Sequence, residues 1–338
     1  MVRMTSKITT LVSIFGISLI FLEIVLRVFD PIGIIYYPEA ERYFSKMIPD
    51  QEYGYIHTPG FCGKFQGVDV TINRHGLRGP EFEIKKSPGI KRILILGDSV
   101  IFGWGVPQNL ILSARLQKLL DEKHMDYQVI GAGVGSWNTR TEYEFFKKWG
   151  VKYDPDILIL AVTANDILPK EAWHSDAGKE KLFPLSGKTK KRPSCKGSIN
   201  IFGEWVIKKS YALMYTTHIY RRNFEDKKEC ININNMNHDE NSAYWEDAKL
   251  ALTGIADICR NMNISLIVYL YGFGNDGNVY ERFLLQRGIE FHLFPGYIYD
   301  LKYNNSKVDG HRNASGNQLM AEEVFKNLQP TLKQLDKK

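Results

Sequence analysis

The sequence is poor in cysteine, and its few thiols lie at spacings that do not build a metal site. Its 338 residues include only four cysteines, with no C-x-x-C pair and no combination of cysteine and histidine at zinc-ligand spacing. Glycine-rich phosphate loops are also missing, because Gly97, Gly103 and Gly105 fit neither the dinucleotide nor the nucleoside-triphosphate pattern. The sequence therefore implies no metal and no organic cofactor.

Signals for nucleic-acid binding are absent too, although the chain carries a formal net charge of +6. No zinc finger, helix-turn-helix or aromatic-basic repeat occurs. Residues 167–240 hold fourteen Lys and Arg against nine Asp and Glu, so most of the excess charge lies in this one segment. A basic face attracts acidic polysaccharide, anionic lipid or nucleic acid, and the plainer alternative is a solvated insertion without a specific ligand.

One long hydrophobic run stands at the N-terminus. Ile8 to Val28 contains no proline, its only charged residues are Glu23 and Arg27, and its 21 residues are enough to cross a bilayer as a helix. A cleaved signal peptide normally has a shorter apolar region followed by small residues, which are missing here. We therefore expect an uncleaved anchor. Arg3 and Lys7 precede it, which favours a cytoplasmic N-terminus and a body in the periplasm or outside the cell. Glu23 and Arg27, one turn apart, are expected to pair.

A body outside the cytoplasm permits disulfide bonds. Cys195 and Cys230 both fall in the basic segment, and a bridge between them would close it into a loop. Cys259 lies in an apolar helical pattern and is expected to be a buried free thiol.

From Lys91 onward, apolar runs of strand length alternate with amphipathic helical patterns. The runs are RILILG, YQVIGA, DILILAV and ISLIVYLY, a weaker strand is expected at IEFHLF, and a helix closes the chain at residues 314–335. Continuous apolar strands separated by helices predict a three-layer α/β/α sandwich with a mainly parallel, flavodoxin-like sheet. We expect an anchor over residues 1–29, a linker and small cap over 30–90, and this domain over 91–338, interrupted by the basic insertion.

Polar residues cluster where these strands end, and ligands of open parallel sheets bind at that edge. Three segments follow the first three strands: Gly97-Asp98-Ser99, GAGVGSWNT at 131–139 and TAND at 163–166. A fourth, VDGHRN at 308–313, comes just before the last helix and is expected to reach the same edge. A serine hydroxyl becomes a nucleophile when an adjacent base takes its proton. Ser99, His311 and Asp309 are therefore the candidate nucleophile, base and orienting acid. Candidate oxyanion donors are the Ser99 N–H, the N–H of Gly135 or Ser136, and the Asn165 amide.

Each segment also has a purely structural explanation. Gly-Asp-Ser is a common turn, and Gly133 and Gly135 can serve turn geometry alone. Asn165 and Asp166, or Asp309 and Asn313, can cap helices. If all four segments had only a structural role, four independent coincidences would have to fall on one edge of the sheet.

The four blocks, taken in order, resemble the SGNH or GDSL family of serine esterases and lipases. ILILGDSVIFGWGV is similar to the first block, with Ser99 as nucleophile; GAGVGSWNTR, TAND and VDGHRNASGNQLMAEEV are similar to the other three. NRHGLRGPE and EIVLR resemble membrane-tethered bacterial members, and the resemblance covers about residues 73–328 without the insertion.

Three positions depart from the family pattern. Ser136 stands where glycine is common, one step after Gly135, and Thr163 replaces the glycine of the third block. Only Gly310 separates Asp309 from His311, where two residues are usual, so a Ser-His pair assisted by a backbone carbonyl is an alternative to the full triad.

The resemblance implies a single-pass, membrane-anchored serine hydrolase that cleaves an ester on an envelope glycan, a lipid or a small molecule. Two alternatives stay open. The first is an O-acyltransferase, in which the same site transfers the acyl group to a sugar hydroxyl of an envelope polysaccharide. The second is a membrane-tethered module that binds a glycan or a lipid and has no catalytic activity.

Overall fold

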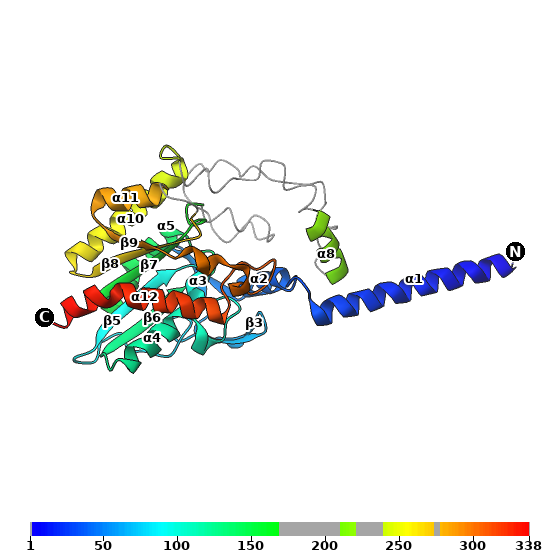
Figure 1. The fold of residues 1–338 in the computed structure, drawn as a ribbon, viewed down its shortest axis with the longest axis horizontal. Helices are drawn as coiled ribbons and strands as arrows, with labels where there is room; N and C mark the ends of the chain where they lie inside the picture. The colour runs from blue at the N-terminus through cyan, green and yellow to red at the C-terminus, as the bar shows by residue number, and fades with distance from the viewer. Residues whose placement is uncertain (1, 169–209, 221–238, 274–277, 338) are drawn as a thin grey trace. The chain divides into compact units, whose positions relative to one another are not determined.

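The structure, a computed structural model, describes residues 2–168, 210–220, 239–273 and 278–337 (Figure 1). The chain forms two compact units. The first comprises residues 1–40, 191–231 and 306–309, and the second comprises 41–190, 232–305 and 310–338. Most of the basic insertion expected at 167–240, including Cys195 and Cys230, lies outside the described residues.

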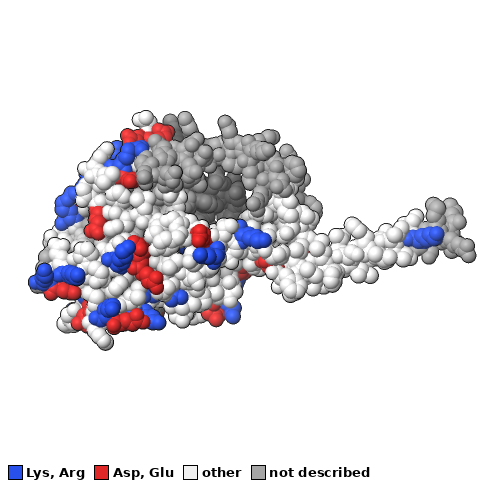
Figure 2. All heavy atoms as spheres, viewed as in Figure 1, with Lys and Arg blue, Asp and Glu red and all other residues white. Residues whose placement is uncertain are grey.

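Helix α1 (Val2–Phe29) carries the N-terminal hydrophobic run. Its segment Lys7–Phe29 has a mean hydropathy of 2.3 and is long and apolar enough to cross a membrane, a property that signal sequences share. Large apolar side chains such as Leu11, Phe15 and Phe21 are exposed along it. Its surface is accordingly drawn almost entirely without charge in Figure 2.

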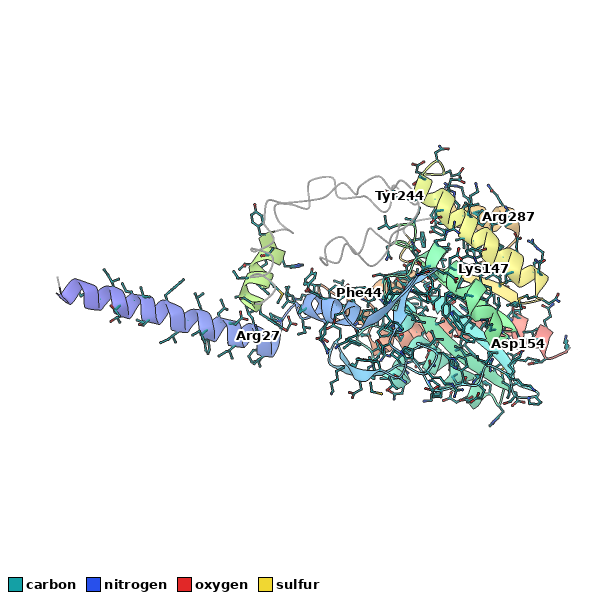
Figure 3. All side chains as sticks on the ribbon, turned by 180° about the vertical axis from the view of Figure 1, so that it is seen from behind. Arg27, Phe44, Lys147, Asp154, Tyr244 and Arg287 are labelled. Atoms are coloured by element: carbon teal, nitrogen blue, oxygen red, sulfur yellow. The ribbon has the colours of Figure 1, made fainter. Side chains whose placement is uncertain are left out.

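The two charged residues within this run do pair. Arg27, labelled in Figure 3, donates from Nε to Glu23 Oε1 at 2.7 Å, as expected from their spacing. The Glu23 carboxylate also accepts hydrogen bonds from the backbone N–H groups of Tyr211 and Ala212 and from the Ser210 hydroxyl. It therefore caps helix α8 (Tyr211–Tyr220), whose first N–H groups have no partner within the helix.

The second unit contains a five-stranded sheet in which every neighbouring pair is parallel. Its strands are β5 (Lys91–Gly97), β6 (Tyr127–Gly133), β7 (Ile157–Thr163), β8 (Ser265–Tyr271) and β9 (Glu290–Leu293). They are ordered β6-β5-β7-β8-β9, which is the flavodoxin-like order of a doubly wound sheet. The predicted fold class is confirmed, and the weak strand expected at IEFHLF is present as β9.

Helices cover both faces of the sheet (Figure 1). On one face, α4 (Leu112–Glu122) packs against α12 (Ala314–Leu335), and their apolar side chains join the strands in one core cluster. On the other face, α5 (Thr139–Lys148) packs against α10 (Ala243–Asn261). In Figure 3, the label Lys147 marks the C-terminal end of α5 and the label Tyr244 marks the N-terminal end of α10. Helix α11 (Val279–Arg287) leads into β9. Cys259 on α10 is buried and free, as predicted.

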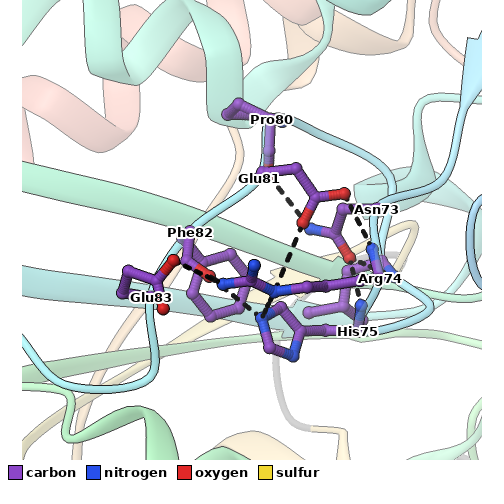
Figure 4. Close-up of polar contacts among 8 residues, drawn as sticks. Asn73, Arg74, His75, Pro80, Glu81, Phe82 and Glu83 are labelled. Atoms are coloured by element: carbon purple, nitrogen blue, oxygen red, sulfur yellow. Dashed lines mark hydrogen bonds and ion pairs between the residues drawn. The ribbon is translucent and has the colours of Figure 1, made fainter.

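The segment expected as a linker and small cap, residues 30–90, forms small elements. Helix α2 spans Tyr36–Phe44, and two antiparallel hairpins follow: β1 (Met47–Asp50) with β2 (Gly54–His57), and β3 (Cys62–Phe65) with β4 (Val68–Thr71). The NRHG turn comes next, and Figure 4 shows its contacts. Asn73 Oδ1 accepts from the N–H groups of His75 and Leu77, and Arg74 pairs with Glu81 and Glu83.

Short helical turns complete the second unit. They are α3 (Ser99–Phe102), η1 (Gln108–Leu110), η2 (Gly150–Tyr153), η4 (Gly296–Tyr299) and η5 (Leu301–Tyr303). Helix α3 is the one that holds a candidate site residue.

Candidate active site

The register of the sheet brings three of the four polar segments to one edge. Gly97 at the end of β5 pairs with Gly133 on β6 and with Ala161 on β7. Two residues beyond this row come Ser99, Gly135 and Thr163. Segments far apart in the sequence therefore leave the sheet at the same level, as expected for parallel strands.

Ser99 follows directly from β5 and opens the single-turn helix α3. The Asp98 carboxylate caps this turn by accepting from the Val100 N–H at 2.8 Å, and Gly103 ends it with φ +73°. A Cβ atom on Gly133 would lie 2.2 Å from the Phe102 nitrogen, so glycine is required there for α3 to rest on β6.

His311 lies at hydrogen-bond distance from Ser99. Its Nε2 atom is 2.7 Å from Ser99 Oγ, within the range that proton transfer to a general base requires. For Nε2 to accept the serine proton, the neutral ring must carry its own proton on Nδ1. Of all the sequence-predicted site residues, these two make the contact on which nucleophilic catalysis depends.

Backbone hydrogen bonds hold the loop that carries His311. The His311 carbonyl accepts from the Asn305 N–H at 2.9 Å. Buried Arg312 donates to the Ile298 carbonyl, and the Asn317 amide donates to the Arg312 carbonyl. The histidine is therefore fixed through its own carbonyl group, its neighbour Arg312 and the first turn of α12, although its ring stays partly exposed.

Asp309 belongs to the first of the two compact units. It is 1% exposed, and its N–H donates to Ser306 Oγ at 3.0 Å. Its role as the acid that orients His311 stays a prediction.

The Gly135–Ser136 turn offers one backbone donor rather than two. The Gly135 N–H already donates to the Tyr43 hydroxyl at 2.8 Å. No hydrogen bond from the Ser136 N–H occurs among the described residues. Of the two alternatives left open by the sequence, the Ser136 N–H is therefore the one suited to an oxyanion, because Tyr43 occupies the other.

A buried hydrogen-bond chain stands behind the Gly135 N–H. His57 Nδ1 lies 3.0 Å from the Gly76 carbonyl, so Nδ1 must carry the proton and Nε2 must accept. Tyr43 Oη is 2.7 Å from His57 Nε2 and therefore donates to it. The donor and acceptor of each hydrogen bond are therefore fixed, from the Gly135 N–H through the Tyr43 hydroxyl and the His57 ring to the Gly76 carbonyl.

Asn165 presents its amide next to Thr163. The Thr163 hydroxyl is 2.7 Å from Asn165 Oδ1, and no hydrogen bond from Asn165 Nδ2 occurs among the described residues. Using Oδ1 as the acceptor fixes the amide plane and leaves the NH₂ group as the donor, as an oxyanion site requires. The threonine that replaces a glycine of the family pattern thus orients Asn165.

Three buried carboxyl groups lie beneath this edge. Asp98 and Asp166 both contact the Thr163 hydroxyl, at 3.2 and 2.8 Å, and Glu142 has no partner for either oxygen among the described residues. Burial raises the pKa of all three, and the charge of Asp98 raises the pKa values of Asp166 and Glu142 further. Protonated Asp166 can donate to Thr163 Oγ1, which frees the threonine proton for Asn165 Oδ1.

Sequence reasoning did not find Tyr43, Tyr55, His57, Thr163 or Glu142 as site components. Tyr43, Tyr55 and His57 lie in the segment expected to be a linker and cap, and no spacing relates them to residues more than 70 positions later. Glu142 occupies the first turn of an amphipathic helix, where an acidic residue is common on the exposed side.

Comparison with known proteins finds similarity to solved structures only. No protein-family model matches the chain, and no curated protein matches it either. Among solved structures, the chain is similar to the psychrotrophic esterase EstA from Pseudoalteromonas sp., with 15% identity over 72% of this chain and 99% of that one and a TM-score of 0.43.

Two further structures are similar at a comparable level. They are a putative lipolytic protein of the G-D-S-L family from Desulfitobacterium hafniense DCB-2 (12% identity, 70% and 98% of the chains, TM-score 0.40) and a family 3 carbohydrate esterase from Clostridium thermocellum (12%, 73% and 98%, 0.39). Likeness at this level concerns the fold, so an activity has to be inferred from the site itself.

Proposed function

We propose that this protein is a membrane-anchored serine hydrolase that cleaves esters through an acyl-enzyme. The observation that carries the proposal is the 2.7 Å approach of His311 Nε2 to Ser99 Oγ at the carboxyl edge of a parallel sheet. A serine and a histidine at this distance form the minimal unit for nucleophilic acyl transfer. The register of β5, β6 and β7 supports it by bringing candidate oxyanion donors to the same edge.

The reaction then follows from the roles of these groups. Ser99 Oγ forms a bond to the ester carbonyl carbon while its proton passes to His311 Nε2. The negative charge on the carbonyl oxygen is stabilised by the Asn165 amide and the N–H groups of Ser136 and Ser99. The carbon–oxygen bond to the alcohol breaks, and the leaving oxygen takes the proton from His311. Water repeats the sequence on the acyl-enzyme, releasing the acid and restoring Ser99.

Asp309 completes the proposed machinery as the acid that holds the His311 ring with its proton on Nδ1. Its near-complete burial suits a carboxylate shielded from water. The substrates that we infer are esters borne by an envelope glycan, a lipid or a small molecule.

The test of the nucleophile uses the full-length chain in detergent with a fluorophosphonate probe, followed by mass spectrometry to locate the adduct. We expect an adduct on Ser99 and p-nitrophenyl acetate turnover that Ser99→Ala abolishes. Ser45→Ala, which replaces an exposed serine, should keep both properties. A folded wild-type chain that neither reacts nor turns over ester would refute the proposal and favour a binding module. Faster acyl release on adding an oligosaccharide, with ester formed on the sugar, would identify a transferase.

We further propose that α1 remains attached and that the body lies outside the cytoplasm. A variant that keeps Cys62 as its sole cysteine provides the test, because the Cys62 side chain is exposed. A membrane-impermeant maleimide should label it in cells with a permeabilised outer layer and an intact inner membrane, and the intact mass should include residues 8–28. Labelling only after lysis would place the body on the other side.

A further inference from the structure

Residues Val134–Trp137 form a β-turn at the end of β6. The Trp137 N–H donates to the Val134 carbonyl at 3.1 Å, which closes the turn. Ser136, the third residue, has φ +59°, whereas Gly135, the second, is not among the glycines with positive φ. A turn with positive φ at its third residue alone is a type II turn.

The local sequence does not favour this turn. Type II turns prefer glycine at the third position because a Cβ atom disfavours the left-handed region, and serine carries that penalty here. The alternative is a type I turn, which differs by a flip of the peptide between Gly135 and Ser136 and gives the third residue a negative φ. Gly135 accommodates either form, since it lacks a side chain. Contacts from elsewhere in the fold must therefore select the observed form.

Tyr55 makes the contact that distinguishes the two turns. Its hydroxyl donates to the Gly135 carbonyl oxygen at 2.9 Å, and this carbonyl belongs to the peptide that a flip would reverse. In a trans peptide the C=O and the N–H point in opposite directions. The contact that fixes the Gly135 C=O toward Tyr55 thus fixes the Ser136 N–H away from it.

Tyr55 is itself held in place. It lies on β2, is 2% exposed, and its carbonyl accepts from the Trp137 indole N–H at 3.0 Å. Tyr43 holds the neighbouring peptide through the Gly135 N–H. A Cβ atom on Gly135 would lie 2.7 Å from Tyr43 Cε1, so the turn and the two tyrosines are closely packed.

We propose that Tyr55 is a positioning residue that holds the Gly135–Ser136 peptide in the orientation in which the Ser136 N–H serves the oxyanion. It touches neither substrate nor the reacting atoms. It acts through this peptide, and its hydroxyl also contacts the side chain of Ser136. The inference rests on the proposed esterase function and adds a residue outside the four sequence blocks to its machinery.

The experiment compares Tyr55→Phe with wild type and adds a second substitution at the turn. Tyr55→Phe keeps the buried ring and deletes the hydroxyl. We expect kcat for p-nitrophenyl acetate to fall about ten- to a hundredfold with KM nearly unchanged, less than the 10²–10³-fold effect of removing an oxyanion donor outright. Adding Ser136→Gly should restore most of kcat, because glycine adopts positive φ without penalty.

Ser136→Ala in the Tyr55→Phe background is the matched control. Alanine lacks the hydroxyl, as glycine does, but keeps the Cβ atom that opposes positive φ, so it should not restore kcat. Rescue by both or by neither substitution would overturn the proposal, as would a wild-type kcat in Tyr55→Phe.

The crystal structure of Tyr55→Phe separates this inference from the proposed function. We expect Ser136 to change to negative φ in it, whether or not the protein is an esterase. An unchanged positive φ would overturn the role of Tyr55. A changed turn in a chain whose wild type lacks activity would instead refute the proposed function and leave the conformational role of Tyr55 intact.

Discussion

His57 should make the stability of this protein fall steeply in mild acid. Its ring is fully enclosed between Tyr43, the Gly76 carbonyl and the face of Phe102, with ring centroids 5.0 Å apart in the last case. Burial, aided by the nearby Arg78 guanidinium, lowers the pKa of His57 from 6.5 to about 4. The native ring is therefore neutral where the same ring in the unfolded chain is already protonated.

The direction and size of the effect follow from proton linkage. Because the unfolded state binds the extra proton, the free energy of unfolding is fully retained above pH 6.5 and decreases as the pH falls toward 4. One titrating group changes stability by at most about 1.4 kcal/mol per pH unit, so His57 accounts for about 3 kcal/mol over this range. Protonation also removes the acceptor for the Tyr43 hydroxyl.

Urea unfolding of the full-length chain in detergent, followed by tryptophan fluorescence between pH 4 and 7.5, measures this dependence. His57→Gln should be less stable than wild type at pH 7 but should lose less stability on acidification, by up to about 3 kcal/mol. His124→Gln, which replaces an exposed histidine, is the matched control. Parallel curves for wild type and His57→Gln would refute the reasoning, because the carboxyl groups that titrate in this range are common to both.

Three further predictions concern other parts of the molecule. Asn165→Ala should lower kcat for p-nitrophenyl acetate by about 10²–10³-fold with little change in KM, measured by steady-state kinetics; an equal loss through KM alone would contradict an oxyanion role. Glu142→Gln should raise Tm by a few degrees, more at pH 8 than at pH 5, because the raised pKa of the buried carboxyl costs stability once the unfolded group ionises; a lower Tm at both pH values would contradict this. Glu23→Ala should speed amide hydrogen exchange in residues 211–220 about fivefold, because it removes a helix cap that contributes about 1 kcal/mol. Hydrogen exchange followed by mass spectrometry measures this, and an unchanged rate would show that Glu23 does not stabilise the helix.

The sheet and its helices were predictable from the sequence because their signals are local. A buried parallel strand reads as a continuous apolar run, and the runs at Arg92, Tyr127, Asp156 and Ile264 each became a strand. The placement of Ser99 was also predictable, because the carboxyl ends of parallel strands share one edge. The segment before the last helix was expected at the same edge, and His311 does approach Ser99, although it follows the short turn η5 and not a strand. The pairing of Glu23 with Arg27 followed from helical spacing alone.

Other features depended on contacts across long sequence separations. Glu23 caps a helix that begins 188 positions later, and no periodicity within either segment indicates this. The choice between the Gly135 and Ser136 N–H groups was undecided in the sequence, since it depends on a hydroxyl 92 positions away. Thr163 looked like a departure from a family pattern until its contacts with Asp98, Asn165 and Asp166 were seen.

The sequence by itself therefore determined the layers of the fold, the sheet edge that holds the candidate site, and the residue types gathered there. Hydrophobic periodicity and strand direction act over a few residues, so they are legible in the chain. Only the tertiary structure decided how the Gly135–Ser136 peptide faces, which way the Asn165 amide is turned, and which carboxyl groups have raised pKa values. These depend on burial and on single hydrogen bonds between distant segments, which form only when the chain is folded.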